Sequence, residues 1–140
     1  MPFTYQSIVI NAPVQAVWSR FQDFHDLSWA KSVITNVVKV GEVDGHHVGA
    51  KRIINNVFHE TIIEIDEEKY ELKYLIDDGP SPISKEEVSN YIGHVSLKPI
   101  TEGGGTFVEW SSSWESPSPK AVEFCHGIYV VLLKDLAASF

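Results

Sequence analysis

Arg52 and Glu60 have residue types and a spacing that could bring a positive and a negative charge together. Between them, Asn55, Asn56 and Val57 have a composition typical of a hairpin loop. Because Arg52 and Glu60 are equally distant from Asn56, a hairpin centred there places them directly opposite each other on neighbouring strands. In such a pair the arginine could stabilise a developing oxyanion while the glutamate moves a proton. A purely structural ion pair is an equally good interpretation.

The alternation of a β-strand predicts that this pair faces an apolar interior. Burying two charges is costly unless their remaining hydrogen-bonding groups are satisfied, so we expect a ligand's polar group or ordered water to share the pair. The acidic run 64–71 is most simply a solvated edge, with Glu64 as the exception, because it follows Glu60 with the same parity and is expected on the inner face. The residues that share this face with the pair are Ala50, Ile54, Phe58 and Ile62.

Helices are predicted at both ends of the chain. The sequence Asn-Ala-Pro at residues 11–13 suits a helix start, and apolar residues recur at helical spacing over residues 14–21. A second short helix or turn is expected over residues 24–29. Residues 120–138 contain no proline and predict a long helix whose apolar stripe crosses a sheet.

The rest of the chain has the period of two that is typical of strands, interrupted by turn-rich segments. Short connections make neighbouring strands antiparallel. The chain is therefore expected to be one α+β domain over residues 1–140. Strands are predicted at residues 5–10, 33–40, 50–54, 58–65, 70–76, 88–98 and 106–115.

This order of elements predicts a cavity. A long sheet twists and curls, and one helix about 10 Å wide cannot fill the concave side of seven strands. Side chains whose parity points inward, together with the stripe of the long helix, should line the remaining space. The predicted ligand-binding residues are Ile62, Tyr74, Ile76, Tyr91, Gly93, Val108, Trp110, Ser112, Trp114, Phe124, Ile128 and Leu132.

Composition argues against several other classes of function. A net charge of −8 makes nucleic acid an unfavourable partner, and no apolar run is long enough for an integral membrane protein. No basic and apolar leader follows Met1, so we expect a cytoplasmic protein. We also expect a monomer or a weak homodimer. Cys125 is the only cysteine. Two of the six histidines are adjacent in a predicted turn at residues 46–47 and the other four fall on separate elements, so no metal site and no cofactor are expected.

A set of short segments along the chain carries a family resemblance. These segments are Val48–Arg52, Glu60, Asp66, Leu72, Tyr74, Gly79–Pro82, Tyr91 and Val108–Trp110. In their order and spacing they resemble the polyketide cyclase/dehydrase branch of the START-like, or SRPBCC, superfamily, and the similarity spans nearly the whole chain. The resemblance implies the helix-grip fold of birch-pollen-type allergens, in which a curved antiparallel sheet grips the C-terminal helix around an apolar cavity. In synthase-like members an arginine and a glutamate at the positions of Arg52 and Glu60 look catalytic. The short 55–57 loop and the missing His-Arg-Leu latch argue against hormone sensing.

Three functions follow in order of preference. The first is binding of a small hydrophobic or amphipathic ligand, such as a lipid, a polyketide or an isoprenoid-like compound. The second is a cofactor-independent cyclase, dehydratase or isomerase that uses Arg52 and Glu60. The third is a protein-interaction domain in which the cavity is a by-product of the fold.

Overall fold

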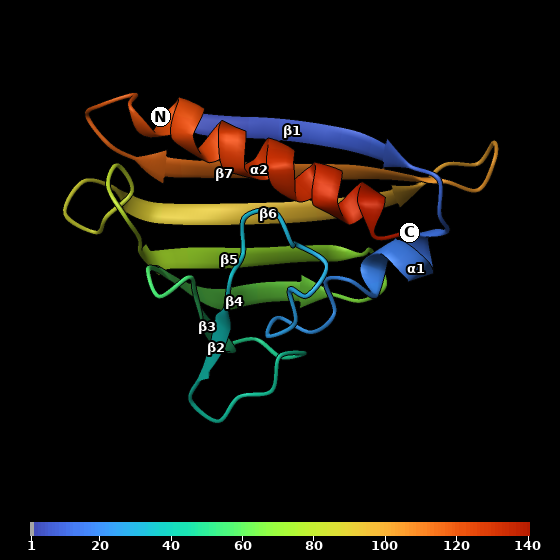
Figure 1. Cartoon of the computed structure of the whole chain (residues 1–140), viewed down its shortest axis with the longest axis horizontal. Coiled ribbons are helices and arrows are strands. Elements are labelled where there is room, and N and C mark those ends of the chain that lie inside the picture. The colour runs from blue at the N-terminus through green and yellow to red at the C-terminus, as the bar shows by residue number, and fades with distance from the viewer. Residues whose placement is uncertain (1) are drawn as a thin grey trace.

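The computed structural model describes residues 2–140, and its centre is a curved, seven-stranded antiparallel sheet. The strands lie in the order β1-β7-β6-β5-β4-β3-β2, so only β1 is out of sequence order, beside β7 at one edge (Figure 1). This confirms the predicted sheet. Its strands are β1 (Phe3–Ile10), β2 (Val37–Val40), β3 (Lys51–Ile54), β4 (Phe58–Asp66), β5 (Glu71–Asp78), β6 (Ser89–Pro99) and β7 (Thr106–Glu115).

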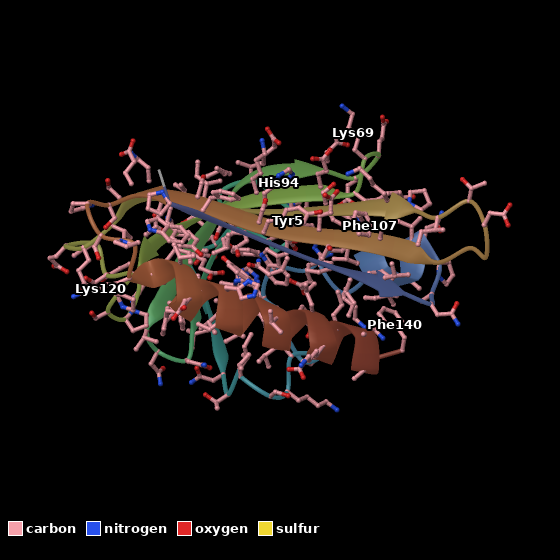
Figure 2. The ribbon with its side chains drawn as sticks, turned by 90° about the horizontal axis from the view of Figure 1, so that it is seen from above. Tyr5, Lys69, His94, Phe107, Lys120 and Phe140 are labelled. Carbon is pink, nitrogen blue, oxygen red and sulfur yellow. The ribbon has the colours of Figure 1, made fainter. Side chains whose placement is uncertain are left out.

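A long helix, α2 (Ala121–Ala138), lies across one side of this sheet. Figure 2 shows α2 running between Lys120 and Phe140, while His94 is on the opposite side of the sheet. The apolar sides of the sheet and of α2 face each other and, together with the segment that follows β1, form one buried cluster. The helix face that is buried in this cluster consists of Ala121, Cys125, Tyr129, Leu132, Leu133 and Leu136.

The segment after β1 contains a single short helix, α1 (Val14–Trp18). At residues 24–29, where a second short helix or a turn was predicted, the chain forms a series of turns and no helix. Side-chain oxygens explain the difference: Asp23 Oδ1 accepts a hydrogen bond from the His25 amide, and Asp26 Oδ1 accepts one from the Ser28 amide. Such local bonds compete with the helical hydrogen-bond pattern.

Strand β2 begins later than predicted, at Val37 instead of Val33. Asn55 holds the preceding residues in a loop, because its Oδ1 accepts hydrogen bonds from the amide and hydroxyl of Thr35 and its Nδ2 donates one to the Val33 carbonyl. Asn55 and Asn56 both have positive φ, a conformation that asparagine tolerates in tight hairpin turns. The hairpin loop therefore also anchors the chain that enters β2.

Gly93 makes room for a large side chain. It pairs with Tyr74 across β5 and β6, and the ring of Tyr74 lies over it. A Cβ atom at residue 93 would fall 2.1 Å from Cζ of Tyr74. The missing side chain at this position therefore provides space for Tyr74 and not for a ligand.

We predict opposite effects for two glycine-to-alanine substitutions. Gly93→Ala should lower the free energy of unfolding by about 1–3 kcal/mol, because the Tyr74 ring would have to move in a packed interior. Gly127→Ala should raise it by about 0.5–1 kcal/mol, because Gly127 is an exposed position inside α2 with no atom near the added methyl group. Urea denaturation of the two variants measures both. Wild-type stability of Gly93→Ala would contradict this account of Tyr74.

Candidate functional site

An internal cavity of about 290 Å³ lies between the sheet and α2. Its wall is largely apolar and comes from β3, β4, β5, β6, β7, α2 and the loops at residues 27–34 and 80–83. The wall residues are Leu27, Val33, Ile34, Arg52, Ile54, Asn55, Phe58, Glu60, Tyr74, Ile76, Pro80, Ile83, Tyr91, Trp110, Phe124, Cys125, Ile128, Tyr129 and Leu132.

Arg52 and Glu60 meet in this wall. They are direct partners across β3 and β4, as the hairpin register predicts. Nε and Nη2 of Arg52 donate to Oε1 of Glu60 over 2.9 and 2.6 Å. Both residues are only 6% exposed. The pair is therefore a buried, doubly hydrogen-bonded salt bridge at the edge of an apolar space.

A third contact fixes the guanidinium of Arg52. Its Nη1 donates to the carbonyl oxygen of Phe24 over 2.8 Å, and its Cζ lies 3.7 Å from the centre of the Phe24 ring. The ring of Tyr74 is 5.9 Å away on the cavity wall. Phe24 itself is held by a hydrogen bond from its amide to the Gly45 carbonyl. The turn segment at residues 24–29 thus positions Arg52 in two ways. The backbone carbonyl of Phe24 accepts a hydrogen bond from the guanidinium, and the Phe24 ring covers it.

The carboxyl group of Glu60 has one oxygen available. Both hydrogen bonds from Arg52 go to Oε1, and no described residue donates a hydrogen bond to Oε2. Burial raises the pKa of the Glu60 carboxyl, although the charge and hydrogen bonds of Arg52 act in the opposite direction. A carboxyl with a raised pKa and a free oxygen in a cavity wall can accept a hydrogen bond or exchange a proton with a bound molecule.

Three tyrosine hydroxyls form a second polar feature of the wall. Tyr129 Oη of α2 lies 3.0 Å from Tyr74 Oη of β5 and 2.7 Å from Tyr91 Oη of β6. The Nε1 of Trp110 donates to Tyr74 Oη over 3.0 Å, and Tyr91 Oη donates to Ser112 Oγ over 3.1 Å. Burial raises the pKa of all three tyrosines well above the ordinary value. They are therefore neutral phenols that join α2 to the sheet.

Most residues predicted from strand parity and from the helix stripe do lie on the cavity wall. Their role in binding a ligand remains a prediction. The wall contains, from the predicted set, Arg52, Glu60, Tyr74, Ile76, Tyr91, Trp110, Phe124, Ile128 and Leu132.

Five predicted residues face the interior but lie behind the wall. Gly93 is covered by the Tyr74 ring, and Trp114 stacks on the far side of Tyr91 with ring centres 5.1 Å apart. Ser112 accepts the Tyr91 hydrogen bond, and Val108 and Ile62 belong to the packed core. Parity predicts which face a side chain occupies. It does not predict whether a larger neighbour covers it.

Glu64 is not on the inner face. The pairing of β4 with β5 shifts between Ile62 and Glu64, so Ile63 is an extra residue and the parity reverses beyond it. The Glu64 side chain is 58% exposed and lies 3.5 Å from Lys73 Nζ.

Tyr129 is the most important wall residue that the predicted stripe omitted. It follows Cys125 by one helical turn, so the spacing of the buried face contained the signal. Other wall residues come from irregular segments, where no periodicity indicates direction. These omitted residues are Leu27, Val33, Ile34, Asn55, Pro80 and Ile83, and Cys125 of α2 is a further omitted wall residue.

Within the described residues, 2–140, no group of three or more histidine, cysteine, aspartate or glutamate side chains is arranged to hold a metal ion. No helix in the same range is long and apolar enough to cross a membrane.

Comparison with known proteins identifies a family for this chain. The family model described as "Polyketide cyclase / dehydrase and lipid transport" matches residues 1–140. No curated protein matches the sequence.

Solved structures share the fold over nearly the full length. A protein from Nitrosospira multiformis is 50% identical, with a TM-score of 0.97 over 99% of this chain and 96% of that one. The protein XoxI from Bacillus cereus is 25% identical, with a TM-score of 0.81 over 100% and 96%. Major latex-like protein 151 of Panax ginseng is 19% identical, with a TM-score of 0.79 over 98% and 95%, which shows the fold alone.

The family match spans all 140 residues, and the sheet, the long helix and the neighbouring structures agree with it. The chain therefore belongs to the polyketide cyclase/dehydrase and lipid transport family of the START-like, or SRPBCC, superfamily and has its helix-grip fold.

Proposed function

We propose that this protein binds one small, mostly apolar molecule inside the cavity, with the molecule's polar end at Arg52 and Glu60. The observation that carries the proposal is the apolar cavity of about 290 Å³ whose wall contains a buried ion pair with a free carboxylate oxygen. Membership of a cyclase and lipid transport family supports a role in ligand binding or in cyclisation.

The size of the cavity limits the ligand. Because an apolar cavity of about 150 Å³ holds one benzene molecule, a cavity of about 290 Å³ has room for roughly a dozen non-hydrogen atoms. This corresponds to a bicyclic compound or a short isoprenoid. A lipid with two long acyl chains does not fit, so within the predicted ligand classes we favour the smallest members.

A second candidate function is acid–base catalysis on the bound molecule. The specific observation in its favour is the raised pKa of Glu60 beside a cation that could stabilise an oxyanion. Arg52 would hold the oxygen that becomes negative, and Glu60 would transfer the proton. Binding is common to both functions, and only the second requires both charges for turnover.

We predict that filling the cavity weakens binding. Ile128→Trp adds bulk to the wall and should weaken binding of a cavity-filling ligand by about tenfold or more, since overpacking costs about 1–3 kcal/mol. Lys134→Trp is the matched control, because Lys134 is exposed on the same helix and is not a wall residue. Titrations of bicyclic hydrocarbons, followed by calorimetry, measure the difference. Equal affinity in the two variants would contradict binding in this cavity.

We predict that replacing both residues of the salt bridge with apolar ones changes the free energy of unfolding little, whereas replacing only Arg52 lowers it strongly. Arg52→Met should lower the free energy of unfolding by about 3–5 kcal/mol at neutral pH, because it leaves a buried carboxylate without its counter-charge. The double variant, in which Glu60→Leu is added, should recover most of this loss.

The pH dependence of the single variant checks the cause. Without Arg52, burial acts on Glu60 unopposed, so its pKa in the folded state rises further above the unfolded value. The folded state then binds more protons, and lowering the pH from about 7 to about 5 should stabilise Arg52→Met. Thermal denaturation across this range measures the effect. A double variant as unstable as Arg52→Met would show that the pair is retained for stability.

We predict that any turnover depends on both charges. Arg52→Leu and Glu60→Gln should each abolish conversion of a substrate while binding of an uncharged hydrocarbon of the same size stays within about a few-fold of wild type. Single-turnover assays with calorimetry of the same samples separate the two effects. Full activity in either variant would eliminate the catalytic role of the pair.

A further inference from the structure

The hydrogen-bonding groups of the cavity wall are unevenly divided between donors and acceptors. Arg52 has five N–H groups, of which three are used by Glu60 Oε1 and the Phe24 carbonyl. One N–H therefore remains on each of Nη1 and Nη2. These two are the charged donors that the described wall offers to a ligand.

The tyrosine hydroxyls have no proton left to donate. Tyr91 gives its single proton to Ser112, so the bond between Tyr91 and Tyr129 must be donated by Tyr129. Tyr129 has then used its proton, so the bond to Tyr74 must be donated by Tyr74. Tyr74 in turn accepts from Trp110. The three phenol oxygens therefore present only lone pairs to the cavity.

The remaining polar wall residues add one neutral donor. Asn55 uses one N–H of its amide nitrogen on the Val33 carbonyl and its amide oxygen on Thr35, so its second N–H has no hydrogen-bond partner among the described residues. Burial raises the pKa of the Cys125 thiol, which stays a weak donor. Glu60 Oε2 is an acceptor with no partner among the described residues. A ligand is thus met by a free carboxylate oxygen and by two N–H groups of an arginine whose charge Glu60 already balances.

We propose that the cavity selects an uncharged ligand whose polar group both donates a hydrogen bond to Glu60 Oε2 and accepts one from Arg52, and that it rejects carboxylates. This inference rests on the proposed function. A carboxylate could accept from Arg52, but it would bring a second negative charge beside Glu60 in a buried site. A primary amide, or a hydroxyl next to a carbonyl, supplies both partners without a charge.

Three bicyclic compounds of nearly identical shape test this selection on the unmodified protein. Naphthamide donates and accepts, acetylnaphthalene only accepts, and naphthoate only accepts and is charged at pH 7. With the substituent on the same ring carbon, calorimetry should give the order amide, ketone, carboxylate. The affinity for the amide should exceed that for the ketone by about tenfold and that for the carboxylate by about 100-fold or more, because a buried polar group without a partner is costly and a second buried charge costs more.

The same titrations in Glu60→Gln provide the control for the group responsible. Glutamine removes the negative charge and leaves Arg52 without its counter-charge, so naphthoate should gain affinity and its order relative to the amide should reverse. An unchanged order in this variant would contradict the role of Glu60. The preference among the three compounds is measured on wild type and does not depend on how well the variant folds.

Unsubstituted naphthalene separates failure of this inference from failure of the proposed function. If naphthalene and all three derivatives bind wild type with naphthoate as tight as naphthamide, the cavity binds ligands but the selection proposed here is wrong. If the ketone and the amide bind with equal affinity, the proposed hydrogen bond from the ligand to Glu60 Oε2 does not form. If neither naphthalene nor any derivative binds, the proposed function is wrong as well.

Discussion

Burial of the Arg52 guanidinium is the constraint on which the site depends. A buried cation needs hydrogen-bond acceptors and a balancing charge, and three groups from two separate parts of the chain supply them. Glu60 on the neighbouring strand supplies the charge, the Phe24 carbonyl accepts a further hydrogen bond, and the Phe24 ring covers one face of the guanidinium. The turn segment after α1 is therefore fixed against the β3–β4 hairpin, and one wall of the cavity is fixed with it.

The tyrosine hydroxyls have a comparable role between the sheet and α2. A phenol buried without a partner is costly, so Tyr129 on the helix pairs with Tyr74 and Tyr91 on two different strands. These long side chains meet at their tips, which joins the helix to the sheet and leaves space beside the rings. The cavity is thus bordered by rigid aromatic side chains whose hydroxyl groups are joined by hydrogen bonds.

Much of this arrangement could be predicted from the sequence, because period and turn chemistry are local signals. The hairpin loop around Asn56 was enough to place Arg52 opposite Glu60, and alternation along β7 correctly put Trp110 on the inner face. The extra residue at Ile63 could not be predicted, because a bulge changes parity without changing composition. Nor could alternation show that Tyr74 covers Gly93, since that depends on the volumes of residues on two strands. The hydrogen bond from Arg52 to the Phe24 carbonyl could not be predicted either, because every residue type has a backbone carbonyl.

The proteins that share this fold do not by themselves indicate a ligand, because the fold leaves a space whose content depends on a few wall residues. In this cavity the wall residues favour a different ligand from the one that an arginine alone would suggest. An arginine in an apolar cavity would ordinarily favour a carboxylate ligand, but Glu60 already occupies that position with Oε1 and keeps Oε2 free. The carboxylate of Glu60 therefore takes the place of an anionic ligand. In our proposal the bound molecule then has to supply a hydrogen-bond donor for Oε2, and a negative charge is not needed. What this cavity admits is decided by the residue that neutralises the arginine.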